Sequence, residues 1–249
     1  MDPTHPRHEP DSPWHDHGRR YYAQLDAHIG SLLEHADDNT SVMLVSDHGA
    51  RAMHGGFCIN EWLIREGYLV LKEQPARPGS LDHAQVDWGR SRAWAEGGYY
   101  ARIFLNIEGR EPTGMVAAEA FHALRSELCA RLGELSDDAG QAIPTEVHIP
   151  NQHYRTARGF PPDLMVYFDD LALRALASVG TESLVVTEDD RGPDSCNHAW
   201  DGMFVFAGPD LPARGPVEGA SLYDITPTVL GAFGIEPPAG ILGRDWSKG

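Results

Sequence analysis

An aspartate and a histidine stand side by side after an apolar run, in the sequence Ser46-Asp47-His48-Gly49. The run itself, 42–45, fits a buried strand of a parallel sheet, and functional groups of open α/β sheets gather where such strands end. A carboxylate oxygen and an imidazole nitrogen are both zinc ligands. Both can reach one ion only if the chain turns, which Gly49 permits. The four residues indicate a metal-binding strand end, although alone they also fit an Asx turn with a surface histidine.

Two later segments add to this strand end. His198 precedes Gly202 and a second apolar run at 203–207, which makes it a candidate metal ligand or a hydrogen-bonded structural histidine. The segment 222–233 predicts a helix that begins near Asp224, is capped by Thr226, and packs on the sheet without chemistry of its own.

The elements that must position these residues follow an α/β order. Apolar residues at helical spacing predict a helix over 21–33 that lies on a core with one face. Helices are also expected at 60–66, ending at Gly67, and at 116–133, while the first 18 residues and the tail from 236 are expected to be irregular. Further strands are expected at 68–71, 92–107, 145–149, 164–168, 184–187 and 203–207.

The composition fits a globular protein. The chain has 249 residues, of which 41% are hydrophobic, which is enough for a sizeable core. It contains no apolar run of about 18 residues and no apolar stretch typical of a secretory signal, so neither a membrane span nor secretion is expected. Its three cysteines are widely spaced and odd in number, which favours a cytoplasmic location over a disulfide framework.

The formal charge of −17 disfavours nucleic acid and anionic membranes as partners. It does not exclude an anionic substrate, because bound cations can reverse the field inside a pocket. Four of the 13 histidines, at 5, 8, 15 and 17, fall in the first 17 residues. They fit either a solvated lead-in or a metal-binding cluster.

Four phrases in this order resemble the type I phosphodiesterase/nucleotide pyrophosphatase branch of the alkaline phosphatase superfamily. They are SDHGA, GGFCINEWLIREGYLVL, NHAWDGMFVFAGP and LYDITPTVLGAFGI, and the resemblance spans nearly the whole chain. It implies an α/β fold with three α/β/α layers and hydrolysis of a small phosphorylated or nucleotide substrate, as a phosphodiester or a nucleotide pyrophosphate.

The resemblance also implies two divalent metal ions, most often zinc. Asp47 and His48 are expected to bind one ion, and His198 is expected to help bind the other. In such enzymes a hydroxyl activated by one metal attacks phosphorus, and water then hydrolyses the phospho-enzyme.

One departure from the family pattern concerns the nucleophile. Family members carry, earlier in the chain, an Asp ligand, a Thr or Ser nucleophile and an Asp-x-x-x-His ligand pair. The hydroxyls of Thr4, Ser46 and Thr226 do not follow the nucleophile pattern. We therefore expect an incomplete chain that lacks the N-terminal strands and the nucleophile.

Two pairs near the N-terminus could be taken for the Asp-x-x-x-His pair. Asp2 and His5 have a spacing of three instead of four, whereas Asp11 and His15 have the spacing of the family pair. A solvated lead-in without metal is the alternative for both pairs.

The middle of the chain is expected to shape the substrate pocket. Residues 1–249 read as one partial domain, in which roughly 74–190 form a smaller inserted α+β cap. Trp94, Tyr99, Tyr100 and Arg102 are candidates for the pocket wall, or are residues of core strands.

These expectations leave several functions open. One possibility is a hydrolase that works with a separate N-terminal half and is poorly soluble alone. A second is a relative of these hydrolases that binds metal or a partner without catalysis. A third possibility is another activity of the superfamily, namely a sulfatase, phosphonate hydrolase or phosphomutase.

Overall fold

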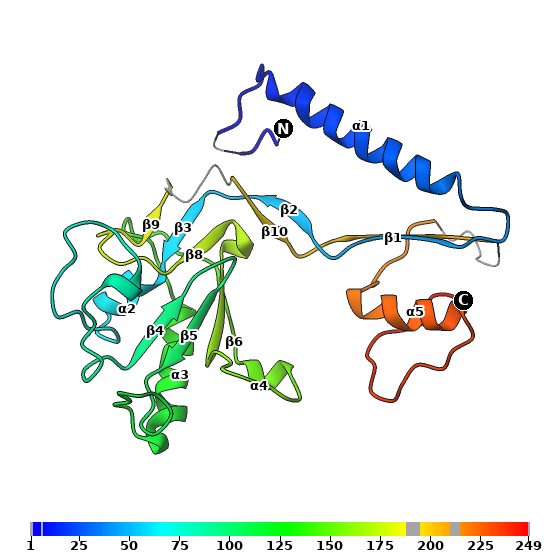
Figure 1. Cartoon of the computed structure of the whole chain (residues 1–249). Helices are drawn as coiled ribbons and strands as arrows, with labels where there is room; N and C mark the ends of the chain where they lie inside the picture. Colours follow the sequence, from blue (N-terminus) through cyan, green and yellow to red (C-terminus); the bar gives the residue numbers. More distant parts are fainter. Residues whose placement is uncertain (1, 6, 188–194, 210–214, 249) are drawn as a thin grey trace. The chain divides into compact units, whose positions relative to one another are not determined.

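The computed structural model describes residues 2–5, 7–187, 195–209 and 215–248, and the chain divides into two compact units (Figure 1). The first unit comprises residues 8–49 and 199–249, and the second comprises residues 2–7 and 50–198. Helices accompany a mixed sheet of several strands, which confirms the α/β class. The single partial domain and the inserted cap at 74–190 stay predictions.

Two apolar strands form the sheet of the first unit. β1 (Val42–Ser46) and β11 (Met203–Ala207) pair antiparallel along their whole length. The other elements of this unit are α1 (Trp14–Leu33), the 3-10 helix η4 (Leu222–Asp224) and α5 (Ile225–Ala232). The unit thus consists of a two-stranded ribbon with helices before and after it in the sequence.

The predicted burial of this unit is wrong. In β1 three residues are half-buried and two are exposed, and β11 alternates exposed and half-buried residues. All of α1 is described, and none of its residues is buried, although the sequence predicts a core-facing stripe. Strands that are apolar on both faces are typical of sheets covered on both sides. The apolar runs predict such covering, whereas the strand pair in the structure is antiparallel and its residues are half-buried or exposed.

The second unit is built on a seven-stranded mixed sheet. Its strand order is β4-β5-β7-β8-β3-β9, and β6 pairs with β7. The pair β3–β8 is parallel, and the other pairs of this sheet are antiparallel. The strands are β3 (Gly55–Cys58), β4 (Ala93–Glu96), β5 (Ala101–Leu105), β6 (Thr145–His148), β7 (Leu164–Phe168), β8 (Leu173–Leu176) and β9 (Val185–Val186). A separate pair joins β2 (Gly49–Ala52) to β10 (Cys196–Ala199).

Helices complete this unit and cover its core. They are α2 (Ile59–Arg65), α3 (Phe121–Leu132), α4 (Pro150–His153) and the 3-10 helices η1 (Leu81–His83), η2 (Ala118–Ala120) and η3 (Asp169–Leu171). The predicted helix at 116–133 is confirmed by α3, which buries Leu124, Leu128 and Leu132 at the expected spacing. These leucines belong to the same core cluster as Ile103 and Val166 of the sheet.

Two buried polar residues at the start of α2 connect it to the sheet. Asn60 is fully buried; its amide donates to the carbonyls of Ala95 and Ala177 at 2.9 and 2.8 Å, and its oxygen accepts from the Ala95 N–H. The Glu61 carboxylate accepts from the N–H groups of Gly180 and Thr181. Because each group is paired, their burial orients α2 at little cost in free energy.

Three local predictions differ from the structure. The helix expected from residue 21 begins at Trp14. The apolar segment 68–71 is not a strand: Tyr68 is buried, but its N–H donates back to Leu63 as the chain leaves α2 through Gly67. Thr226 does not cap α5, since a capping box between Ser221 and Asp224 lies just before it.

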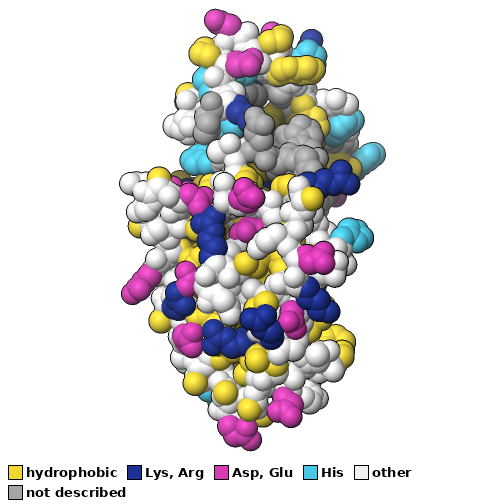
Figure 2. Space-filling view, turned by 90° about the vertical axis from the view of Figure 1, so that its left-hand side faces the viewer, with side chains coloured by type: hydrophobic (Ala, Val, Ile, Leu, Met, Phe, Trp, Pro, Cys, Tyr) yellow, Lys and Arg dark blue, Asp and Glu magenta, His cyan; other side chains and the backbone are white. Residues whose placement is uncertain are grey.

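The surface carries charges of both signs. Over the face shown in Figure 2, Lys and Arg side chains are interspersed with Asp and Glu and do not form one extended basic area.

Within the ranges that the structure describes, none of the helices has the length and apolar character needed to cross a bilayer.

Candidate functional site

Asp47 and His48 directly follow β1, as expected. The Nε2 atom of His48 lies 3.7 Å from Oδ1 of Asp47, and both side chains are more than one third exposed. The other ring nitrogen, Nδ1, lies 2.9 Å from the carbonyl oxygen of Gly49. With the proton on Nδ1 the ring donates there, and Nε2 keeps the lone pair that a metal requires. Two such ligands on one tetrahedral zinc lie about 3.4 Å apart, so this pair fits two positions around one ion.

Close backbone packing fixes the chain around this pair. A Cβ on Gly49 would lie 2.7 Å from the carbonyl oxygen of Asp201, and a Cβ on Gly202 would fall against the carbonyl oxygen of Ser46, well inside contact distance. Gly49 is not among the glycines with positive φ. The expected role of Gly49 in a sharp turn is therefore corrected: the absence of a side chain lets two backbone segments approach each other.

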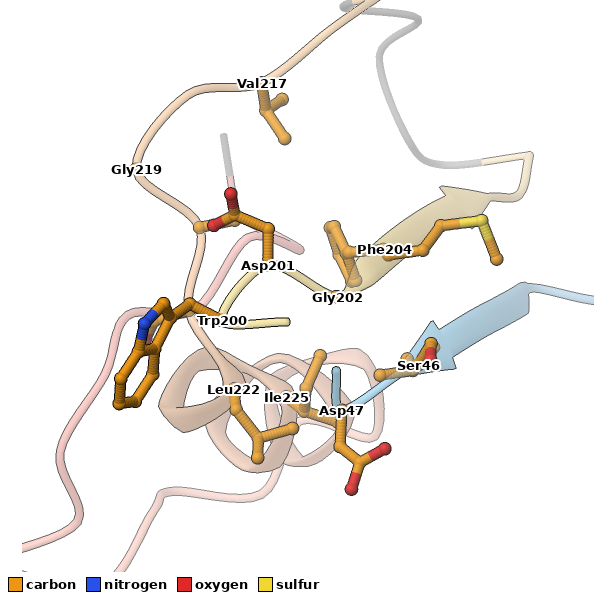
Figure 3. Close-up of a pocket in the computed structure, with 14 residues that line it drawn as sticks. Ser46, Asp47, Trp200, Asp201, Gly202, Phe204, Val217, Gly219, Leu222 and Ile225 are labelled. Atoms are coloured by element: carbon orange, nitrogen blue, oxygen red, sulfur yellow. The ribbon is translucent and has the colours of Figure 1, made fainter. Parts of the chain in front are cut away.

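A cavity of about 430 Å³ lies beside Asp47 within the first unit. Figure 3 shows Ser46 and Asp47 at the end of β1, Asp201 and Gly202 before β11, and Leu222 on the side of η4 and α5. The carboxylates of Asp47 and Asp201 point in opposite directions in this view. The cavity volume suits a small ligand, and its lining combines apolar side chains with these two carboxylates, Ser46 and Ser221.

Asp224 supports the wall of this cavity, a role that the sequence did not suggest. It is 4% exposed, and its carboxylate accepts from the N–H groups of Arg244 and Ser221 at 2.9 Å and from the indole N–H of Trp246 at 3.0 Å. Burial raises the pKa of Asp224, but these donors outweigh burial and hold the pKa below its ordinary value. Asp224 thereby fastens the C-terminal segment to η4 and α5.

His198 lies in β10, within the second unit. Its ring centroid is 3.7 Å from that of Tyr99, and its backbone N–H donates to the side-chain oxygen of Asn197 at 2.9 Å. Asn197 is buried and donates to the carbonyl of Leu171. The backbone that carries His198 is thus anchored by a side-chain network.

The three predicted metal ligands do not all belong to one unit. Within the described ranges, no group of three or more His, Cys, Asp or Glu side chains is arranged to bind a metal ion. Asp47 and His48 belong to the first unit and His198 to the second, so a centre that includes all three stays a prediction. Two of the three predicted ligands are therefore brought together.

The N-terminal Asp–His pairs make other contacts. Asp2 accepts from the backbone N–H and hydroxyl of Thr4, which lower its pKa, and Nε2 of His5 contacts the carbonyl of Ser195 at 3.0 Å. The ring of His15 stacks on that of His8 at 5.7 Å. In the part of the chain that the structure describes, neither pair forms a metal-binding group.

The hydroxyls near the motifs and the residues predicted for the pocket wall also lie in different parts of the structure. Ser46 donates its hydroxyl to the His48 carbonyl at 2.7 Å, which holds it on the backbone. Trp94 and Arg102 line a second cavity, whereas Tyr100 packs against Tyr167 at 4.9 Å between ring centroids. The four residues predicted for one wall thus divide among different surroundings.

The comparisons with known proteins identify the family. The family model described as type I phosphodiesterase / nucleotide pyrophosphatase matches residues 4–194, so the chain belongs to this family of the alkaline phosphatase superfamily. The matched range includes Asp47 and His48 and ends before His198. A search of curated proteins and a search of solved structures each gave no match. At the level of the family, the chain is a hydrolase of the phosphodiesterase and nucleotide pyrophosphatase type, and such hydrolases are generally metal-dependent.

Proposed function

We propose that the chain forms part of a metal-dependent hydrolase of phosphodiesters or nucleotide pyrophosphates, with two divalent ions, most often zinc. In this proposal Asp47 and His48 bind one ion, and His198 helps bind the other. The observation that carries it is the convergence of the Asp47 carboxylate and the His48 imidazole, 3.7 Å apart, beside a cavity of about 430 Å³. Family membership supports the reaction class.

The roles of the chain's own residues follow from their contacts. A divalent ion, when bound, neutralises charge on phosphate oxygens and lowers the pKa of a nucleophile. Asp47 supplies a carboxylate ligand, and His48 supplies its Nε2 atom, because Nδ1 is held by the Gly49 carbonyl. Leu222 adds apolar surface to the cavity beside these ligands.

The nucleophile, in this proposal, is supplied by an N-terminal half that docks on the first unit. Apolar side chains of this unit lie open to solvent, among them Leu32 of α1 at 72% and Phe233 after α5 at 77% exposure. Val205 of β11 is also exposed, and a two-stranded ribbon is marginally stable by itself. Additional strands and helices would cover this apolar surface and extend the ribbon into a sheet.

Hydrolysis in the presence of zinc or manganese tests the proposal. The full chain is assayed with bis(p-nitrophenyl) phosphate, p-nitrophenyl sulfate and a phosphonate monoester, alone and with the N-terminal half of a family member. We expect turnover of the phosphodiester only in the mixture, lost in Asp47→Ala and kept in Asp38→Ala, an exposed residue before β1.

Each other outcome has a definite meaning. Turnover by the chain alone would refute the need for a partner. Preference for the sulfate ester or the phosphonate would change the substrate class, and equal activity of Asp47→Ala would remove Asp47 from the site. A mixture that binds zinc without turnover would favour a non-catalytic relative.

A further inference from the structure

The second unit contains a cavity of about 470 Å³ against the outer face of the β4–β5 hairpin. Along β4, Ala93 and Ala95 face the core, while Trp94 and Glu96 face outward. Arg102 lies opposite Glu96 in the register, on β5. Residues between 80 and 88 line the cavity from the other side. The cavity is thus built from a rigid sheet face and a loop, and its volume suits a small molecule.

Two tryptophans form an angular aromatic wall in this cavity. The rings of Trp88 and Trp94 meet at 83° with centroids 5.3 Å apart. Trp94 stacks in turn on Phe104, its cross-strand partner, at 5.4 Å and 18°. Because Phe104 supports Trp94 from behind, the indole is held in place before any ligand binds.

The charges that line the cavity favour a cation. The guanidinium of Arg102 lies 2.8 Å from the carboxylate of Glu96, and this pair neutralises itself. Asp82 on η1 adds a second carboxylate to the lining, which leaves the cavity with a net negative charge. Indole faces attract positive charge through their quadrupole, and the chain as a whole carries −17. The two indoles of the lining and its net fixed charge therefore both favour a cation over an anion.

We propose that this cavity binds a small organic cation of the quaternary ammonium class. Its apolar groups lie against Trp88 and Trp94, and its positive charge faces Glu96 and Asp82. The proposal concerns a binding site of the second unit and does not depend on the hydrolase proposed above. A neutral planar ring is the competing ligand, because it would also stack on the indoles but would not need the carboxylates.

Calorimetric titration of the full chain, without added metal or hydrolysable substrate, tests the proposal. The probes are choline, its neutral isostere 3,3-dimethylbutan-1-ol, adenosine and inorganic phosphate. We expect choline to bind at least tenfold more tightly than the isostere and adenosine, and phosphate not to bind. Equal affinity for choline and its isostere, preference for adenosine, or no choline binding at millimolar concentration would overturn it.

Variants locate the binding. Glu96→Gln leaves Arg102 as an unpaired cation in the cavity and should weaken choline binding at least tenfold without disturbing the core, because Glu96 is exposed. Trp94→Leu should weaken it similarly. The matched controls are Glu108→Gln, an exposed residue after β5, and Trp14→Leu on α1. Retained choline affinity in Glu96→Gln would contradict the proposal even if Trp94→Leu fails to fold.

Discussion

Replacing Asp224 with asparagine removes a buried charge that fastens the C-terminal segment to α5. In the wild type one carboxylate oxygen accepts from the Arg244 N–H, and the other accepts from both the Ser221 N–H and the indole N–H of Trp246. An asparagine can keep the two contacts with Ser221 and Trp246 by placing its carbonyl oxygen on their side. Its amide group then faces the Arg244 N–H, which loses its acceptor.

The expected loss of stability follows from this one donor. A buried donor left without an acceptor costs about 1–3 kcal/mol. The two hydrogen bonds that remain also lose the charge of their acceptor, which weakens them. We therefore expect Asp224→Asn to lower the free energy of unfolding of the first unit by about 1–3 kcal/mol.

Urea denaturation and the indole N–H resonances in a ¹H–¹⁵N spectrum measure this effect. Trp246→Phe identifies the resonance of Trp246, which should shift in Asp224→Asn while the resonances of the second unit stay in place. Asp26→Asn, in the exposed helix α1, is the matched control and should change neither quantity. Unchanged stability together with an unshifted Trp246 resonance would show that Asp224 does not hold the C-terminal segment.

Three further predictions concern packing, an ion pair and pH. Gly202→Ala places a methyl group against the Ser46 carbonyl oxygen and should destabilise the β1–β11 pair by about 1–3 kcal/mol in urea denaturation. Asp163→Asn breaks a nearly buried bidentate pair with Arg110 and should cost about 2–3 kcal/mol, near the low end for buried pairs because Arg110 is 40% exposed. Since the pKa of Asp224 is lowered on folding, its contribution is complete above about pH 3.9 and is lost as pH falls through the lower folded-state pKa. The stability difference between wild type and Asp224→Asn should therefore shrink below about pH 4 in denaturation curves.

Control variants distinguish these three effects from a non-specific loss of stability. Gly30→Ala lies in α1, where an added Cβ meets no other atom within 4 Å, and should stabilise the helix slightly. Equal effects of Gly202→Ala and Gly30→Ala would contradict the packing argument. Wild-type stability in Asp163→Asn would contradict the role of the ion pair, and a difference that does not shrink below about pH 4 would contradict the titration of Asp224.

The sequence predicts those helices and strands that are determined by the spacing of apolar residues close together in the chain. In α3, Leu124, Leu128 and Leu132 recur at helical spacing, and this spacing alone determines which face is buried. The apolar runs of β1 and β11 likewise predict strands, because such residues favour extended backbone. The burial of these strands could not be read from the runs, since burial depends on the layers that cover them.

Predictions that depend on tertiary contacts fail for a related reason. The apolar residue Tyr68 indicates a strand, but its N–H bonds back to Leu63 and its carbonyl accepts from Arg92 and Ala93, so no ladder forms. In the site, Asp47 and His48 are adjacent in sequence, and their convergence was therefore predictable. The role of Asp224 was not, because its partners lie about 20 residues away at Arg244 and Trp246.

Zinc binding by the full chain, measured in competition with a chromophoric chelator at neutral pH, tests whether Asp47 and His48 bind metal. We expect Asp47→Asn and His48→Gln each to lower the zinc affinity at least tenfold. His35→Gln, an exposed histidine of the same unit, should bind as the wild type does. Wild-type affinity in both site variants would contradict the assignment of Asp47 and His48 as the metal-binding pair.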